Sequence, residues 1–453
     1  MSNRQRNRTN LYVSQQKKPD LWGGLECTVN RVGDVYQDQV KRGGHQDRLS
    51  DLDLIADLGI STLRYPVLWE RAAPEHPDKL DWSWTDERLN RLRELGIRPI
   101  AGLVHHGCGP AYATYDQPEF EHGLAHYARQ VAERYPWINA YTPVNEPLTT
   151  ARFGGLYGHW YPHGKSGKAF VDILLRECRA TVRAMAEIRK VRPDAQLIQT
   201  DDLGKTHSTP LLSYQAELEN ERRWLSWDLL CGRVVPHHPL WDYLRWSGAG
   251  EADLWFLVEN ACPPSVIGVN HYVTSERYLD ENMGAYPDRT HGGNKRHRYA
   301  DTEMVRACPE HRTGLGSLLV EAWERYGLPI AVTEAHLGDC EDEQMRWLGE
   351  VWQQAQLATD AGADIQAVTV WALLGMYDWH CLLTRQEDRH EPGVFNLSSG
   401  KPEPTRLAPM IRRLAAGEPV ESLIPPGRGW WQSAKSTLQL TPSLKQAVSH
   451  FFE

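Results

Sequence analysis

The sequence predicts an α/β protein built as a single (β/α)8 TIM barrel with long loops after its strands. Short apolar runs of strand length alternate with longer segments of helical period, which is the pattern of repeated βα units. A chain of 453 residues suits one such barrel, because α/β barrels often exceed the average domain length. The glycine-rich fingerprint of a doubly wound dinucleotide fold is missing.

Eight apolar runs are the expected strands, and each ends where a loop begins. In order along the chain they are Leu21 to Cys27, Ser61 to Leu68, Arg98 to His105, Trp137 to Asn145, Ala195 to Thr200, Val266 to Tyr272, Leu328 to Glu334, and Ile365 to Leu374. Parallel strands covered on both faces have near-continuous apolar sequences of this kind.

Amphipathic segments between these runs are the expected helices. Residues 48–58 place Leu52, Ile55 and Ala56 on one helical face, and residues 86–95 do the same with three leucines, at positions 89, 92 and 95. Two connections, 157–168 and 277–311, are long and lack periodicity, so we expect them to be functional or mobile loops.

Three parts are expected along the chain. Residues 1–20 form a polar N-terminal extension, 21–416 the (β/α)8 barrel, and 417–453 a C-terminal tail that packs on the barrel or on a partner chain. The N-terminal extension has no apolar segment of the secretory kind, which favours a cytoplasmic location.

Composition argues against several classes of protein. The net charge of -9 is modest and the basic residues are interleaved with acids, so no nucleic-acid partner is expected. No apolar stretch is long enough to span a membrane. The eight cysteines lack any CxxC spacing, so we expect free thiols, no metal site and no cofactor. Eighteen tryptophans weakly favour a sugar ligand. Assembly into a homo-oligomer is left open.

Two glutamates end strand-like runs almost two hundred positions apart. Glu146 lies in Thr142-Pro143-Val144-Asn145-Glu146-Pro147, and Glu334 lies in Val332-Thr333-Glu334-Ala335. Because strand ends converge on one face of a (β/α)8 barrel, the two carboxyl groups are expected to face each other. Such a pair is the minimal equipment for glycoside hydrolysis.

With these motifs, the chain resembles glycoside hydrolase family 1, the β-glucosidase family, from about Trp22 to Leu414. The resemblance implies a retaining, exo-acting β-glycosidase that acts on a small glycoside or an oligosaccharide. Glu146 would be the acid/base and Glu334 the nucleophile. Arg64 and Tyr272 would support Glu334, and Asn145 would hold the sugar 2-OH.

The resemblance also implies a set of sugar-binding residues: Asn30, His106, Trp371, Asp378 and Trp379. Two of these depart from the family pattern, which usually has glutamine at the position of Asn30 and glutamate at that of Asp378. Each change shortens the side chain by one methylene, so the sugar need not be glucose.

The first strand loop, residues 25–38, and the segment Glu391 to Phe395 look closer to a divergent branch of the family. In that branch the barrel is joined to a dTDP-4-dehydrorhamnose reductase-type domain. The likeness favours an unusual deoxy or modified sugar as substrate.

The sequence also leaves other functions open. The barrel could bind sugar without hydrolysing it, or transfer the glycosyl group to an acceptor other than water. A metal-dependent lyase or isomerase ranks last, because no His/Asp ligand cluster ends the strands. Glu26 is an additional carboxylate that could touch substrate or pair with Arg31 or Arg64.

Overall fold

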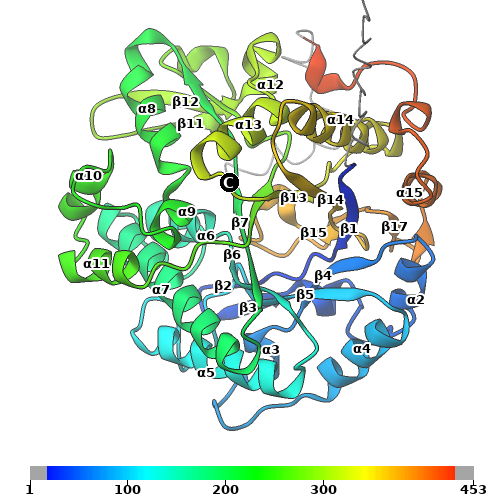
Figure 1. Ribbon diagram of the computed structural model, residues 1–453. Helices are drawn as coiled ribbons and strands as arrows, with labels where there is room; N and C mark the ends of the chain where they lie inside the picture. The colour runs from blue at the N-terminus through cyan, green and yellow to red at the C-terminus, as the bar shows by residue number, and fades with distance from the viewer. Residues whose placement is uncertain (1–17, 434–453) are drawn as a thin grey trace, which may run out of the picture.

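The computed structural model describes residues 18–433, and its centre is a closed barrel of parallel strands surrounded by helices (Figure 1). The barrel runs in the order β1-β4-β5-β6-β7-β9-β13-β14 and closes from β14 back to β1. Its strands are β1 (Asp20–Gly24), β4 (Thr62–Pro66), β5 (Arg98–His105), β6 (Ala140–Asn145), β7 (Gln196–Asp202), β9 (Val266–Asn270), β13 (Ile330–Ala335) and β14 (Ile365–Val370). Each overlaps one of the eight expected runs, so the (β/α)8 barrel prediction is confirmed.

The two ends of the barrel interior differ in chemistry. The amino ends of the strands supply a small apolar layer, made by Ile100, Ala140, Ile198, Val266, Ala331 and Ala367 and closed by Trp22. The carboxyl ends supply polar side chains, among them Arg64, His105, Asn145, Asn270 and Glu334. Packed apolar layers close the bottom of the barrel, and functional groups therefore collect at the top.

Helices cover the outside of the barrel. The longer ones are α2 (Asp51–Ala56), α4 (Ser83–Glu94), α5 (Glu119–Arg134), α7 (Gly167–Val191), α8 (Ser213–Arg222), α9 (Leu225–Leu230), α10 (Trp241–Trp246), α11 (Glu251–Glu259), α13 (Leu315–Tyr326), α14 (Glu341–Asp360) and α15 (Leu407–Ala415). Single turns are α1 (Gln39–Arg42), α3 (Trp69–Ala72), α6 (Pro147–Ala151) and α12 (Met304–Ala307), and a π-helical turn, η1 (Arg152–Leu156), continues α6. The two expected helices at 48–58 and 86–95 correspond to α2 and α4.

The connection 277–311, expected to lack regular structure, instead forms part of a small sheet. It contributes β10 (Arg277–Asp280), β11 (His291–Gly293) and β12 (Arg298–Glu303), and β8 (Thr206–Ser208) pairs along β10. This expectation was wrong because strands of three to six residues are too short to show an alternating pattern. Smaller strand pairs are β2 (Val29–Val32) with β3 (Val35–Asp38), β15 (Met376–Tyr377) with β16 (His390–Glu391), and β17 (Phe395–Asn396) with β18 (Glu403–Pro404).

The described part of the C-terminal tail, residues 417–433, returns to the barrel. Trp431 is fully buried, packs edge-on against Trp347 of α14, and donates its indole N–H to Glu350 Oε2 at 2.6 Å. The extension 1–17 and the end of the tail, 434–453, lie outside the described residues. All eight cysteines are free thiols, as expected. Within residues 18–433, no helix is both long and apolar enough to cross a membrane.

Candidate active site

The two glutamates lie at the carboxyl end of the barrel, and irregular backbone presents each of them. Glu146 directly follows β6 with a left-handed φ of 47°, and Pro147 starts α6 immediately after it. Glu334 lies near the end of β13, where pairing with β9 shifts register between Val332 and Glu334. Irregularities of this kind re-aim side chains and are frequent beside functional sites. The residues are 4% and 2% exposed, so both carboxyl groups are largely removed from water.

Glu334 is held by two donors. Arg64, from β4, donates from Nη1 to Glu334 Oε1 at 2.7 Å, and the Tyr272 hydroxyl donates to Glu334 Oε2 at 2.5 Å. Burial raises the pKa of Glu334, while the Arg64 cation and the Tyr272 hydroxyl oppose that rise. Burial and the Glu334 charge raise the pKa of Tyr272 well above its ordinary value, so the phenol keeps the proton that it donates. Both contacts stabilise the ionised form of Glu334.

Glu146 has a different environment. Asn270 donates from Nδ2 to Glu146 Oε1 at 2.6 Å, and His106 Nε2 lies 3.7 Å from Glu146 Oε2. Burial lowers the pKa of His106 to about 3, so this imidazole is neutral and brings no positive charge. Burial, and then the charge of Glu334, raise the pKa of Glu146 well above its ordinary value. The pair therefore combines a carboxyl group that retains its proton with one that is held by a cation.

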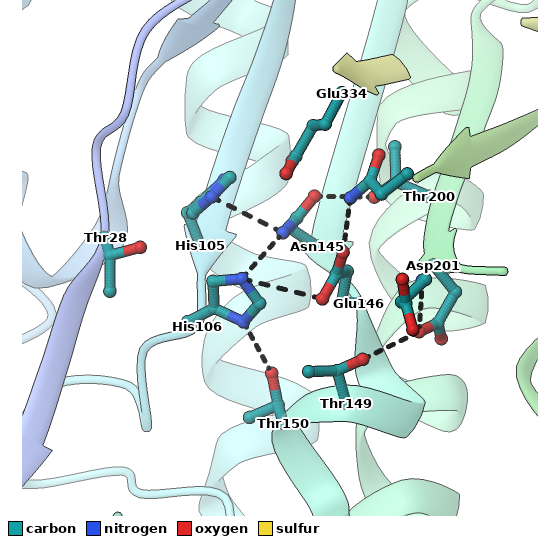
Figure 2. Close-up of polar contacts among 12 residues, drawn as sticks. Thr28, His105, His106, Asn145, Glu146, Thr149, Thr150, Thr200, Asp201 and Glu334 are labelled. Atoms are coloured by element: carbon teal, nitrogen blue, oxygen red, sulfur yellow. Dashed lines mark hydrogen bonds and ion pairs between the residues drawn. The ribbon is translucent and has the colours of Figure 1, made fainter. Parts of the chain in front are cut away.

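Asn145 connects the two halves of the site. Its Oδ1 accepts from Arg64 Nη2 and from Thr200 Oγ1, both at 2.7 Å. Because the oxygen is engaged by two donors, the amide nitrogen is the atom turned toward His105 and His106, at 3.4 and 3.3 Å from their Nε2 atoms (Figure 2). The side chain thus presents a donor beside both glutamates.

Aromatic side chains line the same end of the barrel. Trp371 follows β14, stacks on His105 with ring centroids 5.4 Å apart, and lies under the Arg64 guanidinium at 4.6 Å. Trp379 contacts His106, at a centroid distance of 5.6 Å, and also Trp160, at 6.2 Å. These rings offer flat apolar surfaces next to the carboxyl groups.

Several buried polar atoms have no hydrogen-bond partner within the described residues. Three belong to residues expected to bind sugar: Trp371 Nε1, Trp379 Nε1 and Asn30 Oδ1. The other end of the Asn30 amide donates to the Leu383 carbonyl at 3.4 Å. Buried polar groups are nearly always hydrogen-bonded in folded proteins, so a hydroxyl-bearing ligand or water is the natural partner for these atoms.

Asp378, expected to bind sugar, is instead occupied by the protein. It is completely buried with a φ of 57°, and Arg42 Nη2 donates to its Oδ2 at 2.6 Å. The backbone amides of Glu387 and Asp388 donate to the same oxygen, and the amide of Arg389 donates to Oδ1. These donors hold the pKa of Asp378 below its ordinary value despite burial. The carboxylate therefore anchors the loop that follows it, and its role in sugar binding stays a prediction.

Glu26 makes neither of the ion pairs considered for it. Arg31 pairs with Asp34 and Arg64 with Glu334, while Glu26 Oε1 accepts from the Thr28 amide at 2.9 Å. Burial raises the pKa of Glu26 to about 7.

Sequence reasoning missed three contributors to the site. Asn270 stands two residues before Tyr272, and its position at the end of β9 could have identified it. Thr200 and Asp201 end β7, where the apolar run becomes polar, which is a weaker signal.

Comparison with known proteins supports what the geometry indicates. Residues 17–232, slightly under half of the chain, match the model of glycosyl hydrolase family 1; this span contains Glu146 and ends before Glu334. Beta-glucosidase 4 of Oryza sativa is 22% identical over 80% of this chain and 83% of its own length. An aryl-phospho-beta-D-glucosidase of Bacillus subtilis is 21% identical over 80% of this chain and 84% of its own length.

Solved structures share the fold. A beta-glucosidase from Thermotoga maritima in complex with azafagomine superposes with a TM-score of 0.71 at 17% identity, covering 88% of this chain and 98% of the other. Taken with the family match and the sequence relatives, the chain is a glycoside hydrolase. Within that class, residues 17–232 are similar to glycosyl hydrolase family 1.

Proposed function

We propose that this protein is a retaining, exo-acting β-glycosidase that works by double displacement. The observation that carries the proposal is the unequal support of the two glutamates. Glu334 receives a cation and a phenol, whereas Glu146 receives one neutral amide and lies beside a neutral imidazole. Acid/base and nucleophile roles require this difference in protonation.

In the first step, a Glu334 oxygen attacks the anomeric carbon while Glu146 gives its proton to the departing glycosidic oxygen. The C–O bond to the leaving group breaks as the glycosyl ester forms. In the second step, Glu146 removes a proton from water, and the oxygen of that water displaces Glu334. The amide nitrogen of Asn145, fixed by Arg64 and Thr200, is placed to donate to the sugar 2-OH in both transition states.

The sugar is proposed to be a deoxy or otherwise modified one rather than glucose. Asp378 is completely buried and its carboxylate already accepts four hydrogen bonds from the protein, so it offers less to a ligand hydroxyl than an unoccupied carboxylate would. Asn30 retains a single free acceptor, Oδ1. A site with fewer acceptors reads fewer hydroxyls, and the likeness to the branch joined to a sugar-nucleotide reductase points the same way.

A panel of aryl β-glycosides tests both the retaining mechanism and the preference for a modified sugar. We expect release of the aryl alcohol, a first-formed sugar with the β configuration by ¹H NMR, and higher kcat/KM for a 6-deoxy sugar than for glucose. A 2-deoxy-2-fluoro glycoside of the best substrate should label Glu334. No turnover across the panel together with no labelling of Glu334 would show a barrel that binds sugar without hydrolysing it.

Transfer to an acceptor is distinguished in the same assay. Adding a simple alcohol gives an alkyl glycoside in place of free sugar if the glycosyl ester is intercepted. A product ratio that favours the alkyl glycoside at low alcohol concentration would identify a transglycosylase.

A further inference from the structure

The end of β7, with Thr200 and Asp201, lies beside Glu146, and its residues contact the chain on both sides of this glutamate (Figure 2). The Glu146 amide donates to the Thr200 carbonyl at 3.2 Å, and Thr200 Oγ1 donates to Asn145. The neighbouring Asp201 carboxylate accepts from the Leu148 amide at 3.0 Å and from Thr149 Oγ1 at 3.4 Å. Two successive residues of one strand therefore hold four positions around the glutamate: Asn145, Glu146, Leu148 and Thr149.

We propose that Asp201 is a positioning residue for Glu146, which both fixes the turn that presents this glutamate and, through its negative charge, keeps the glutamate protonated until the leaving group departs. The inference rests on the proposed function, because it assigns Glu146 the acid/base role. Asp201 itself touches no substrate.

The backbone conformation of Glu146 explains why these contacts from Thr200 and Asp201, the clamp, are needed. Glu146 is a non-glycine residue in the left-handed region, and such a conformation persists only where surrounding contacts hold it. The first turn of α6 also leaves amide donors without helical acceptors, and Asp201 supplies an acceptor for one of them from a different strand. Loss of the Asp201 acceptor would release the turn that aims Glu146.

The charge of Asp201 acts on a buried neighbour. Asp201 is 0% exposed; burial raises its pKa to about 6, and the Leu148 amide opposes that rise. Above that pH it is ionised, and after burial and Glu334 its charge is the next contribution that raises the pKa of Glu146. Once Glu334 has become an ester it no longer carries charge, whereas Asp201 still does. Asp201 thus also sustains the basicity of Glu146 in the second step.

Other titratable groups surround Glu146 and Asp201. On the Glu146 side lie Glu334 of β13, His106 after β5, and the Tyr272 phenol. On the Asp201 side lie Asp202 of the same strand, Arg152 of η1, and Glu177 of α7. Arg152 is 4.0 Å from Asp202 and lowers the pKa of Asp201.

Glu177 is the matched control for the role of charge. Both of its carboxylate oxygens lack partners within the described residues, and burial, followed by the Asp201 charge, raises its pKa well above its ordinary value. It is therefore a neutral acid, and Glu177→Gln removes no charge. Thr149→Val is a second control, because it removes one clamp contact and leaves the charge of Asp201 in place.

The test is the pH dependence of kcat/KM in the wild type, Asp201→Asn, Glu177→Gln and Thr149→Val. Asp201→Asn should move the basic limb, which reports loss of the Glu146 proton, to lower pH by about one unit. At pH 8 an alkyl glycoside should consequently lose up to about tenfold more activity than a dinitrophenyl glycoside, which needs little protonation. The two control variants should keep the wild-type basic limb.

A measurement independent of turnover separates this inference from the proposed function. Glu146 can be titrated by ¹³C NMR of carboxyl-labelled glutamate, with its signal assigned by its loss in Glu146→Gln. A lower Glu146 midpoint in Asp201→Asn supports the inference even if no β-glycoside is hydrolysed. An unchanged midpoint, or an unchanged basic limb in an active enzyme, overturns it and leaves the hydrolase proposal standing.

Discussion

Replacing Tyr272 with phenylalanine removes one hydroxyl and little else, so it isolates the second support of Glu334. The hydroxyl donates to Glu334 Oε2 at 2.5 Å, while Arg64 continues to hold Oε1. The variant should fold, because the ring and the arginine contact remain. What it loses is the donor that stabilises negative charge on one oxygen of the nucleophile.

The size of the effect follows from the kind of hydrogen bond. A hydrogen bond to a charged group contributes about 1.5–3 kcal/mol. At about 1.36 kcal/mol for each pH unit, its loss should raise the pKa of Glu334 by about one to two units. The sign is fixed by the donor: Tyr272 favours the ionised form, so without it Glu334 takes up a proton at higher pH.

The assay is kcat/KM against pH with an activated aryl β-glycoside, which makes the rate depend on the nucleophile. In Tyr272→Phe the acid limb should move upward by about one to two units, so the loss at pH 5 should exceed the loss at pH 7 by up to about tenfold for each unit of the shift. Far-ultraviolet circular dichroism and the melting temperature check that the fold is intact. An acid limb in the wild-type position would refute the assignment of Tyr272 as a support of Glu334.

Three further substitutions examine the site. Glu334→Ala should lower kcat by at least about 10⁴-fold, and azide should partly restore turnover and give the α-glycosyl azide; a near wild-type rate would remove Glu334 as nucleophile. Glu146→Ala should slow alkyl glycosides far more than dinitrophenyl glycosides, and equal losses on both would count against a proton-donor role. Asp378→Ala should lower the free energy of unfolding by about 3–5 kcal/mol, because it leaves three amides without their acceptor and leaves the half-buried Arg42 with Asp388 as its remaining carboxylate partner. Chemical denaturation measures this change, and a loss below about 1 kcal/mol would show that the anchor is dispensable.

The sequence alone was sufficient to predict the barrel, because each strand is marked by a pattern within a short segment of the chain. Each strand is a short apolar run bounded by polar residues; Glu146 directly follows one such run, and Glu334 ends another. Three further residues, Arg64, Asn145 and Tyr272, also lie at or near the ends of apolar runs. A closed barrel must bring these strand ends together. The sheet containing β10 to β12 was missed because its strands are too short to establish a period.

Tertiary structure decided which polar atoms are occupied and which are free. From sequence, Asp378 and Asn30 look alike as shortened sugar-binding residues. In the fold, Arg42 and three amides occupy the first, while the second keeps one buried oxygen without a partner within the described residues. The partners of a carboxylate lie far along the chain and are chosen by packing, so residue type and spacing cannot reveal them.

The relation between Glu146 and Asp201 has the same origin. Fifty-five positions separate the two residues in the sequence, and the parallel pairing of β6 with β7 brings them close together. The sequence by itself determined the barrel and the position of the two glutamates at strand ends, because both depend on patterns within short segments of the chain. Only the fold determined what supports each glutamate, because burial and hydrogen bonding depend on neighbours brought together by closure of the barrel.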